Sequence, residues 1–123
     1  MDKTITIDGK QVTFRKTGGT ALRYKRQFGR ELNEDLDKIL TMFPKLKAYD
    51  GSEEEKVAAA HTLLGAETEW MYDVVFIMAQ QADETLTDEI AWLDTFDDFN
   101  IWLVFFELFP LIQKEQQVSP KNA

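Results

Sequence analysis

The sequence contains no cysteine and a single histidine among its 123 residues. The absence of cysteine excludes disulfides and thiolate metal ligands, and it is typical of a protein that works in a reducing cytosol. The histidine, His61, has no carboxylate or second imidazole at helical spacing, so it does not predict a metal site. We expect neither a metal nor another cofactor.

Long apolar runs are also missing. The stretch FNIWLVFFELFPLI, residues 99–112, is fourteen residues long and contains Glu107 and Pro110, whereas a membrane-spanning helix needs roughly 20 apolar residues. Asp2 and a strand-like pattern follow Met1 directly, so no secretory signal is visible. These observations predict a cytoplasmic protein that has no contact with a membrane.

Residues that could carry catalysis are not grouped in the sequence. No serine or threonine has the strand–turn–helix context of an activated nucleophile. The paired carboxylates stand where helices are expected to begin, and they are Asp83 and Glu84, Asp88 and Glu89, and Asp97 and Asp98. Helix capping and the helix dipole explain them without general acid–base chemistry. We therefore expect no enzyme activity and no catalytic residue.

The net charge of −8 is unevenly distributed. Residues 1–50 hold 11 basic and 7 acidic residues, a net of +4, whereas residues 51–123 hold 3 basic and 15 acidic residues, a net of −12. Two solvated faces of opposite sign account for this asymmetry, and so does the steering of partners or the head-to-tail alignment of copies.

The length is that of one domain. We expect the domain to comprise residues 1–117, with a β-hairpin over 1–16 and helices over 20–117. The polar residues 118–123 are expected to form a flexible tail.

The N-terminus has the pattern of a β-hairpin. Two alternating runs, TITI and KQVTFRK, flank the dipeptide Asp8-Gly9, and both residues of such a turn need positive φ. An isolated hairpin is marginally stable in water, so its apolar face must pack on helices or on another strand. Its outer edge is open to the strand of a second chain. The residues expected to be buried are Ile5, Ile7, Val12 and Phe14.

Apolar residues at three- and four-residue spacing predict helices over the rest of the chain. The first, 21–28, is expected to begin at a Thr20 cap and to end at Gly29. The second is expected over 33–43, before Pro44.

Ser52 and Glu55 form a capping box that opens a long central helix. This helix is expected to run to about Ala82, with Gly65 as the candidate interruption. Its second half is apolar nearly all round, which places it in the middle of a bundle.

Two further helices are expected toward the C-terminus. Thr87 or Asp88 caps a short one that runs through Leu93. Asp97 or Asp98 caps the last one, and Pro110 is expected to kink or break that last helix. The predicted fold class is mainly α with an N-terminal β-hairpin, an α+β domain. It forms a small bundle of about four to five helices around a long central helix.

The segment RYKRQFGR, residues 23–30, is the densest basic patch. A basic helix with aromatic residues can contact phosphates, but the pI of about 4.6 and the acidic second half disfavour binding to a polyanion. Pairing of this segment with the acidic half, within one chain or between copies, is the more economical interpretation. The candidate residues of this self-association or electrostatic patch are Arg23, Lys25, Arg26 and Arg30.

The aromatic strip within residues 99–112 is the candidate partner-binding surface. A large apolar side chain contributes about 1.5–3 kcal/mol when it is buried, so five of them rival the stability of a whole domain. We expect part of the strip to face the core and the rest to bind another chain, helix in groove, with aromatic anchors. Burial of the whole strip within the monomer is the alternative. The candidate contacts are Trp102, Phe105, Phe106, Phe109 and Ile112.

The order of these features resembles that of the tail assembly chaperones of long-tailed, siphovirus-type bacteriophages and prophages of Gram-positive hosts. The resemblance rests on the hairpin and basic helix at 5–32, on EWMYDVVFIMAQQAD at 69–83, and on EIAWLDTFDDFNIWLVFFELFPLI at 89–112. No family motif fixes the partner-binding residues, so only the apolar character of the last helix is carried over.

The resemblance implies a non-enzymatic role. Such a chaperone binds the tape measure protein and keeps it soluble in the host cytoplasm until the tail tube polymerises around it, and it is absent from the mature virion. The family resemblance further implies self-association into a homo-oligomer and a longer form of the protein made by ribosomal slippage. Pro120-Lys121-Asn122 can be encoded with the slippery heptamer A-AAA-AAC, which sequencing of these codons tests.

Two alternatives remain open. One is a small phage interaction or regulatory module that binds a host or virion protein. The other is a nucleic-acid-associated protein that uses residues 23–30, whose binding would depend on salt.

Overall fold

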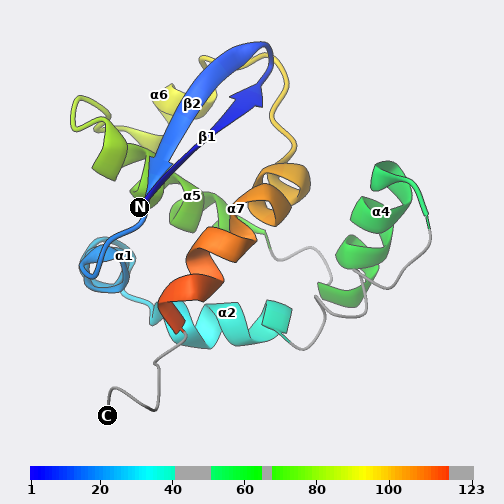
Figure 1. Cartoon of the computed structure of the whole chain (residues 1–123), viewed down its shortest axis with the longest axis horizontal. Helices are drawn as coiled ribbons and strands as arrows, with labels where there is room; N and C mark the ends of the chain where they lie inside the picture. Colours follow the sequence, from blue (N-terminus) through cyan, green and yellow to red (C-terminus); the bar gives the residue numbers. More distant parts are fainter. Residues whose placement is uncertain (41–50, 65–67, 117–123) are drawn as a thin grey trace.

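The structure is a computed structural model that describes residues 1–40, 51–64 and 68–116, and it consists of an N-terminal hairpin followed by helices (Figure 1). The strands are β1 (Asp2–Ile7) and β2 (Lys10–Arg15), and the helices are α1 (Thr20–Phe28), α2 (Leu32–Leu40), α4 (Glu53–Leu64), α5 (Glu69–Ala82), α6 (Glu89–Leu93) and α7 (Ile101–Gln116). The predicted class, a mainly helical α+β fold with an N-terminal hairpin, is confirmed. None of the helices in these residues has the length and apolar content that a membrane span requires.

The hairpin forms as the sequence predicts. Asp8 and Gly9 have φ values of 53° and 76°, which a two-residue turn of this kind requires at both positions. The strands pair antiparallel, with Ile5 opposite Val12. Phe14 is fully buried, and β2 packs on α5, so the hairpin gains from the helices the apolar cover that it lacks alone.

Helix α5 is the centre of the molecule (Figure 1). Every residue from Trp70 to Ala79 is buried except Tyr72, which is half-buried. The hairpin, α1 and α7 all contact α5. The predicted central, nearly all-apolar helix is therefore present.

The single long helix predicted over residues 52–82 is wrong, because the structure divides it into α4 and α5. The capping box at its start is correct: the Ser52 amide donates to Glu55 Oε1 (3.0 Å), and the Glu55 amide donates to Ser52 Oγ (3.2 Å). A second start occurs at Thr68, whose backbone is not helical (φ −121°). Gly65, the candidate interruption, lies outside the described residues.

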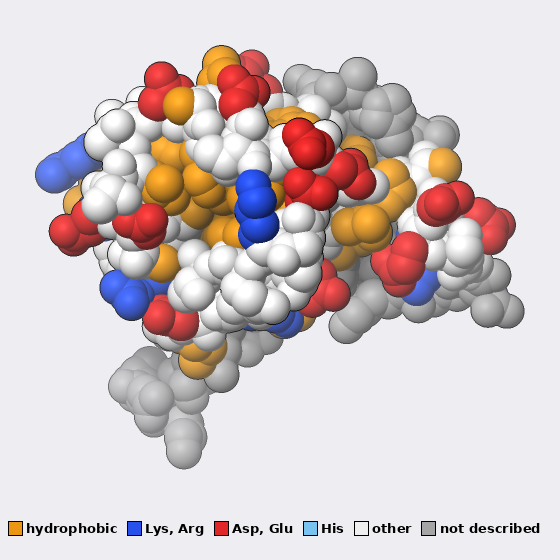
Figure 2. All heavy atoms as spheres, turned by 90° about the horizontal axis from the view of Figure 1, so that it is seen from above, with side chains coloured by type: hydrophobic (Ala, Val, Ile, Leu, Met, Phe, Trp, Pro, Cys, Tyr) orange, Lys and Arg blue, Asp and Glu red, His pale blue; other side chains and the backbone are white. Residues whose placement is uncertain are grey.

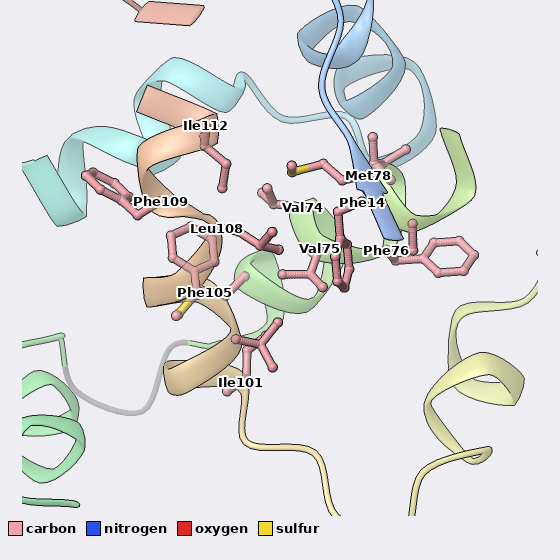
Figure 3. Packing of buried hydrophobic residues seen from close by; sticks show 14 of the residues in the cluster. Phe14, Val74, Val75, Phe76, Met78, Ile101, Phe105, Leu108, Phe109 and Ile112 are labelled. Carbon is pink, nitrogen blue, oxygen red and sulfur yellow. The ribbon is translucent and has the colours of Figure 1, made fainter. Parts of the chain in front are cut away.

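Helix α7 packs against α5 and closes the core. In Figure 3, Leu108 and Ile112 point from α7 toward Val74 and Val75 of α5, and Phe109 points to the opposite side of α7. Phe76 points the other way from α5 and packs on the ring of Trp92 in α6 (5.9 Å between centroids). The aromatic side chains of three helices thus form one continuous core.

A buried lysine ties the hairpin to α7. Lys16 is 5% exposed, and its Nζ donates to the carbonyl oxygen of Ile112 (2.9 Å). A buried cation needs such a hydrogen-bond partner to offset its lost hydration. The end of β2 is therefore fixed next to the C-terminal half of α7.

Three of the predicted helix ends are confirmed. Gly29 ends α1 in the left-handed conformation (φ 74°) and donates its N–H to the carbonyl of Lys25. Asp88 caps α6, accepting from the amide of Ala91 (3.0 Å), and α6 ends at Leu93.

Three other expectations about helix ends are wrong. Thr20 is not the cap of α1 but its first residue, and its hydroxyl accepts from the Thr17 amide and donates to Gln81 Oε1. Asn100, not Asp97 or Asp98, caps α7, because the helix starts at residue 101. The break expected at Pro110 does not occur, because α7 continues past it to Gln116, and the kink expected there stays a prediction.

Several expectations lie outside the described residues. They concern the end of the second helix at 41–43, Pro44, the tail at 118–123 and the codons of residues 120–122.

Candidate protein-interaction site

The aromatic strip lies mostly inside the molecule. Trp102 is 5% exposed, Phe105 and Ile112 are 0% exposed, and Phe109 is 1% exposed. These four side chains belong to the part of the strip that faces the core, because α4, α5 and β1 all pack around α7. Phe106 is half-buried. The partner-binding role assigned to the strip stays a prediction.

One side of α7 remains accessible. Leu103 and Phe106 are half-buried, and Glu107 and Pro110 are exposed. Their spacing of three and four residues places them on one side of the helix. Apolar side chains thus line the accessible side of α7 at two positions.

A hollow of about 460 Å³ lies between this side of α7 and β1. Leu103 and Val104 line it from the helix, and Thr4 and Thr6 line it from the strand. An ion pair between Lys3 and Glu107 (3.6 Å) connects the two elements. This hollow combines apolar side chains with a strand edge.

The strand edge beside the hollow offers free backbone groups. Met1 and Lys16 exchange two hydrogen bonds (2.9 and 2.8 Å), and bonded pairs alternate along an antiparallel ladder. The backbone N–H and C=O groups of Thr4 and Thr6 therefore point away from β2. β1 is paired on one side only in the described two-stranded sheet, so this edge can accept an added strand or an extended segment.

The four predicted basic residues have different surroundings. Lys25 pairs with Glu31, and Arg30 turns toward the acidic half of the chain. Arg23 and Arg26 are exposed, and with Leu22 they line a second hollow of about 560 Å³ beside α5. Neither arginine forms an ion pair with any residue that the structure describes.

Arg30 belongs to a largely buried polar network. Its guanidinium pairs with the buried carboxylates of Asp35 (3.2 Å) and Asp73. It also donates to the Tyr24 hydroxyl (3.1 Å), which donates to Asp35 (2.7 Å). Burial and the hydrogen bond to Asp35 raise the pKa of Tyr24, so the phenol stays protonated. The expected pairing of the basic half with the acidic half within one chain is confirmed for Arg30.

A third hollow, of about 600 Å³, lies between α5 and α6 and is acidic. Glu69, Asp88 and Glu89 line it around Ile90, which is 69% exposed. Burial, hydrogen bonding to Asp73 and the charge of Asp73 raise the pKa of Glu89 to about 8. This site therefore gathers acidic side chains beside an exposed aliphatic side chain.

Sequence patterns do not predict this acidic hollow or the Arg30 network. Asp73 is a recognisable signal for a buried polar contact, because it is the single charged residue in the apolar part of α5. No sequence pattern indicates that Ile90 is exposed, because its exposure depends on how the five-residue helix α6 lies against α5.

The surface chemistry is mixed at the end of the molecule that carries the hairpin turn, α6 and the start of α7. Figure 2 shows hydrophobic side chains reaching the surface there, with acidic side chains around them. No group of three or more His, Asp or Glu side chains in the described ranges could hold a metal ion. The side chain of His61 lies outside these ranges.

No protein-family model, curated protein or solved structure matches this chain. A functional assignment therefore depends on its surfaces and on the sequence resemblance described above.

Proposed function

We propose that the protein is a phage tail assembly chaperone that binds the tape measure protein and keeps it soluble before the tail tube polymerises. The order of sequence features supports this proposal. The observation that carries it is the hollow between β1 and α7, where Leu103 and the backbone of Thr4 are accessible together.

This hollow suits a partner that must be held and later released. Leu103 and Val104 offer an apolar contact, and the outward N–H and C=O groups of Thr4 and Thr6 can bond to a partner's main chain. Main-chain bonds are largely independent of the partner's sequence. A groove of this small size gives weak binding per copy, and many weakly bound copies along one long chain are easier to displace than one tight complex.

The experiment is co-expression with the tape measure protein of the same phage genome, with its soluble fraction measured. The wild-type chain is expected to raise the soluble fraction, and Leu103→Glu is expected to remove this effect because it places a charge in the hollow. The matched control is Ile90→Glu, which places the same charge on the α6 surface and is expected to leave the effect intact. Circular dichroism verifies that both variants are folded.

A second variant tests the strand edge without touching the apolar side. Thr4→Pro removes an outward N–H of β1, and Thr13→Pro removes the corresponding outward N–H of its cross-strand partner on β2. Only Thr4→Pro is expected to lower the soluble fraction. If the wild-type chain does not raise the soluble fraction, the chaperone proposal is wrong. If the Leu103→Glu and Thr4→Pro variants both raise the soluble fraction as much as the wild-type chain does, the hollow is the wrong site.

The ion pairs of the basic segment weaken the alternative of nucleic-acid binding through residues 23–30. Lys25 and Arg30 are engaged with carboxylates of this chain. Arg23 and Arg26 alone would contact few phosphates. Retention on DNA at low salt that is lost at high salt would favour this alternative.

A further inference from the structure

A basic hollow of about 560 Å³ lies between α1 and α5. Leu22, Arg23 and Arg26 line it from α1, and Ile77 and Gln80 line it from α5. It shares no lining residue with the hollow between β1 and α7. The basic hollow is therefore a second site, separate from the one that the proposed function uses.

Helix α1 has a core side and an outer side. Tyr24 is fully buried on the core side. Leu22, Arg23 and Arg26 are all exposed, and they follow one another at the three- and four-residue steps that place side chains on one side of a helix. The outer side of α1 thus presents one aliphatic and two cationic side chains together.

The two arginines of the basic hollow are available to a partner. Lys25 and Arg30 pair with carboxylates of this chain, whereas Arg23 and Arg26 have no ion pair within the part of the chain that the structure describes. A guanidinium binds a carboxylate through two parallel N–H···O bonds. Because the whole chain has a net charge of −8, most of its surface repels an acidic partner and this hollow attracts one.

The apolar part of the basic hollow narrows the class of ligand. Leu22 is 52% exposed at its rim, and Ile77 is 2% exposed beneath it. An exposed aliphatic side chain next to unpaired cations fits a protein ligand that has acidic and apolar side chains on one face. A nucleic-acid backbone makes no use of Leu22, and two arginines contact few of its phosphates.

We propose that the basic hollow binds an acidic amphipathic helix of another protein, with its carboxylates on Arg23 and Arg26 and an aliphatic side chain on Leu22. The two arginines are three residues apart on α1, so carboxylates three or four residues apart on the partner helix have the matching separation. The partner helix lies in the groove between α1 and α5, where its apolar side covers Leu22.

A second copy of this chain is a poorer occupant of the basic hollow. Its exposed acidic surface surrounds Ile90 and includes Glu89. Burial and the hydrogen bond to Asp73 raise the pKa of Glu89 to about 8, so this carboxyl is largely protonated at neutral pH. An acidic helix without such surroundings is charged at both positions that face the arginines.

The experiment measures binding to the whole chain by fluorescence anisotropy of a labelled probe. The probe is an alanine-based helical peptide with glutamates at three- and four-residue spacing and leucines beside them. The wild-type chain is expected to bind this peptide, and to bind it more weakly when its leucines are replaced by serine. A peptide with glutamine in place of glutamate, and a labelled DNA oligonucleotide, are expected not to bind.

Variants of α1 locate the site. Arg23→Glu and Arg26→Glu are each expected to raise the dissociation constant of the acidic peptide about tenfold or more, because like charges then meet. The matched control is Lys25→Glu, the same charge change on the same helix but outside the hollow, and it is expected to change the constant much less. Leu22→Asn leaves the charge unchanged and is expected to weaken binding of the leucine peptide but not of its serine form.

Four outcomes overturn the proposal. The first is no binding of the acidic peptide at the highest soluble concentration of the chain, and the second is equal binding by the two arginine variants, with their fold verified by circular dichroism. The third is tighter binding of the DNA oligonucleotide, lost in the same variants, which would assign the hollow to a polyanion. The fourth is a dimer mass in light scattering that Arg23→Glu abolishes, which would assign it to a second copy. The tape measure protein is absent from the experiment, so its result is independent of the proposed function.

Discussion

At the scale of the residue, burial separates core side chains from surface side chains within the aromatic strip. Phe105 packs on Trp70 (5.4 Å between centroids) and on Phe109 (6.3 Å). Its neighbour Phe106 is half-buried. Adjacent, chemically identical residues therefore have different roles in stability.

We expect Phe105→Ala to lower the free energy of unfolding by about 3–5 kcal/mol, because it leaves a cavity in a packed core. Phe106→Ala is expected to cost less than half as much, since its ring is already partly in water. Urea unfolding followed by circular dichroism measures both. Equal losses for the two variants would show that the strip is not buried as the structure has it.

Glu89 makes stability depend on pH. Its pKa is about 8 in the folded chain, against a usual value of 4.5, mainly because of burial. The folded chain therefore holds a proton that the unfolded chain releases between these two values. Stability from this group is complete below pH 4.5 and is lost as the pH rises toward 8. Because Glu89 is only half-buried, solvent screening limits the loss to no more than about 2 kcal/mol.

Glu89→Gln is expected to flatten the stability profile between pH 5 and pH 8, since the amide cannot ionise, and to be more stable than the wild type at pH 8. The exposed Glu84→Gln serves as the control and should follow the wild-type profile. Unfolding free energies across this range measure the effect. A Glu89→Gln profile that falls as steeply as the wild type would show that another group is responsible.

Residue-scale chemistry was only partly predictable from the sequence. The burial of Ile7 and Phe14 follows from alternation along the hairpin, which local pattern reveals. The pairing of Arg30 with Asp73 joins residues 43 positions apart. Local sequence patterns do not identify contacts across such a separation. The sequence therefore predicts that basic and acidic residues pair, but not which basic residue pairs with which acidic one.

At the scale of the element, helix ends follow from individual hydrogen bonds. Asn100 Oδ1 accepts from the amides of Trp102 (3.1 Å) and Leu103 (3.3 Å). The acidic pair at 97 and 98 was an equally good sequence candidate. The competing contact explains the outcome, because the Asp97 amide donates to Asp8 Oδ2 of the hairpin (2.9 Å), which holds this segment outside the helix.

We expect Asn100→Ala to lower the free energy of unfolding by about 0.5–2 kcal/mol, because two amides at the start of α7 lose their acceptor. Asp98→Ala is the matched control and is expected to change it little, since Asp98 lies before the cap. Thermal unfolding measures both. A larger effect at Asp98 would place the start of α7 earlier than residue 101.

Element lengths were less predictable than element types. The hairpin and the five-residue α6 appear where turn and capping residues indicated them. The division into α4 and α5 was not predicted, because a capping box and a run of helix-forming residues mark where a helix begins but not where it ends. A second start at Thr68 depends on packing around α5, which the pattern does not contain.

At the scale of the whole molecule, the hairpin turn binds the loop between α6 and α7. Lys10 Nζ donates to the carbonyl of Thr95 and lies over the ring of Phe96 (5.3 Å). Asp8 accepts from the amide of Asp97. These contacts join residues more than eighty positions apart, so they link the N-terminal strands to the C-terminal helices.

We expect Asp8→Gly to preserve the turn, because glycine also adopts positive φ, but to release the Asp97 amide. Hydrogen exchange at Asp97 should become faster, while exchange in β1 and β2 stays slow. The control is Gln11→Ala, an exposed change in the same hairpin that does not touch the loop. Unchanged exchange at Asp97 would mean that Asp8 does not hold this loop.

The three tryptophans allow the core to be followed by intrinsic fluorescence. Trp70, Trp92 and Trp102 are each at most 7% exposed, and they belong to α5, α6 and α7 respectively. The indole of Trp70 lies beneath the ammonium of Lys38 (5.7 Å), which places a positive charge beside its excited state. Intrinsic fluorescence of the unlabelled chain therefore samples three separate helices at once, and coincident red shifts from all of them would mark a single cooperative transition.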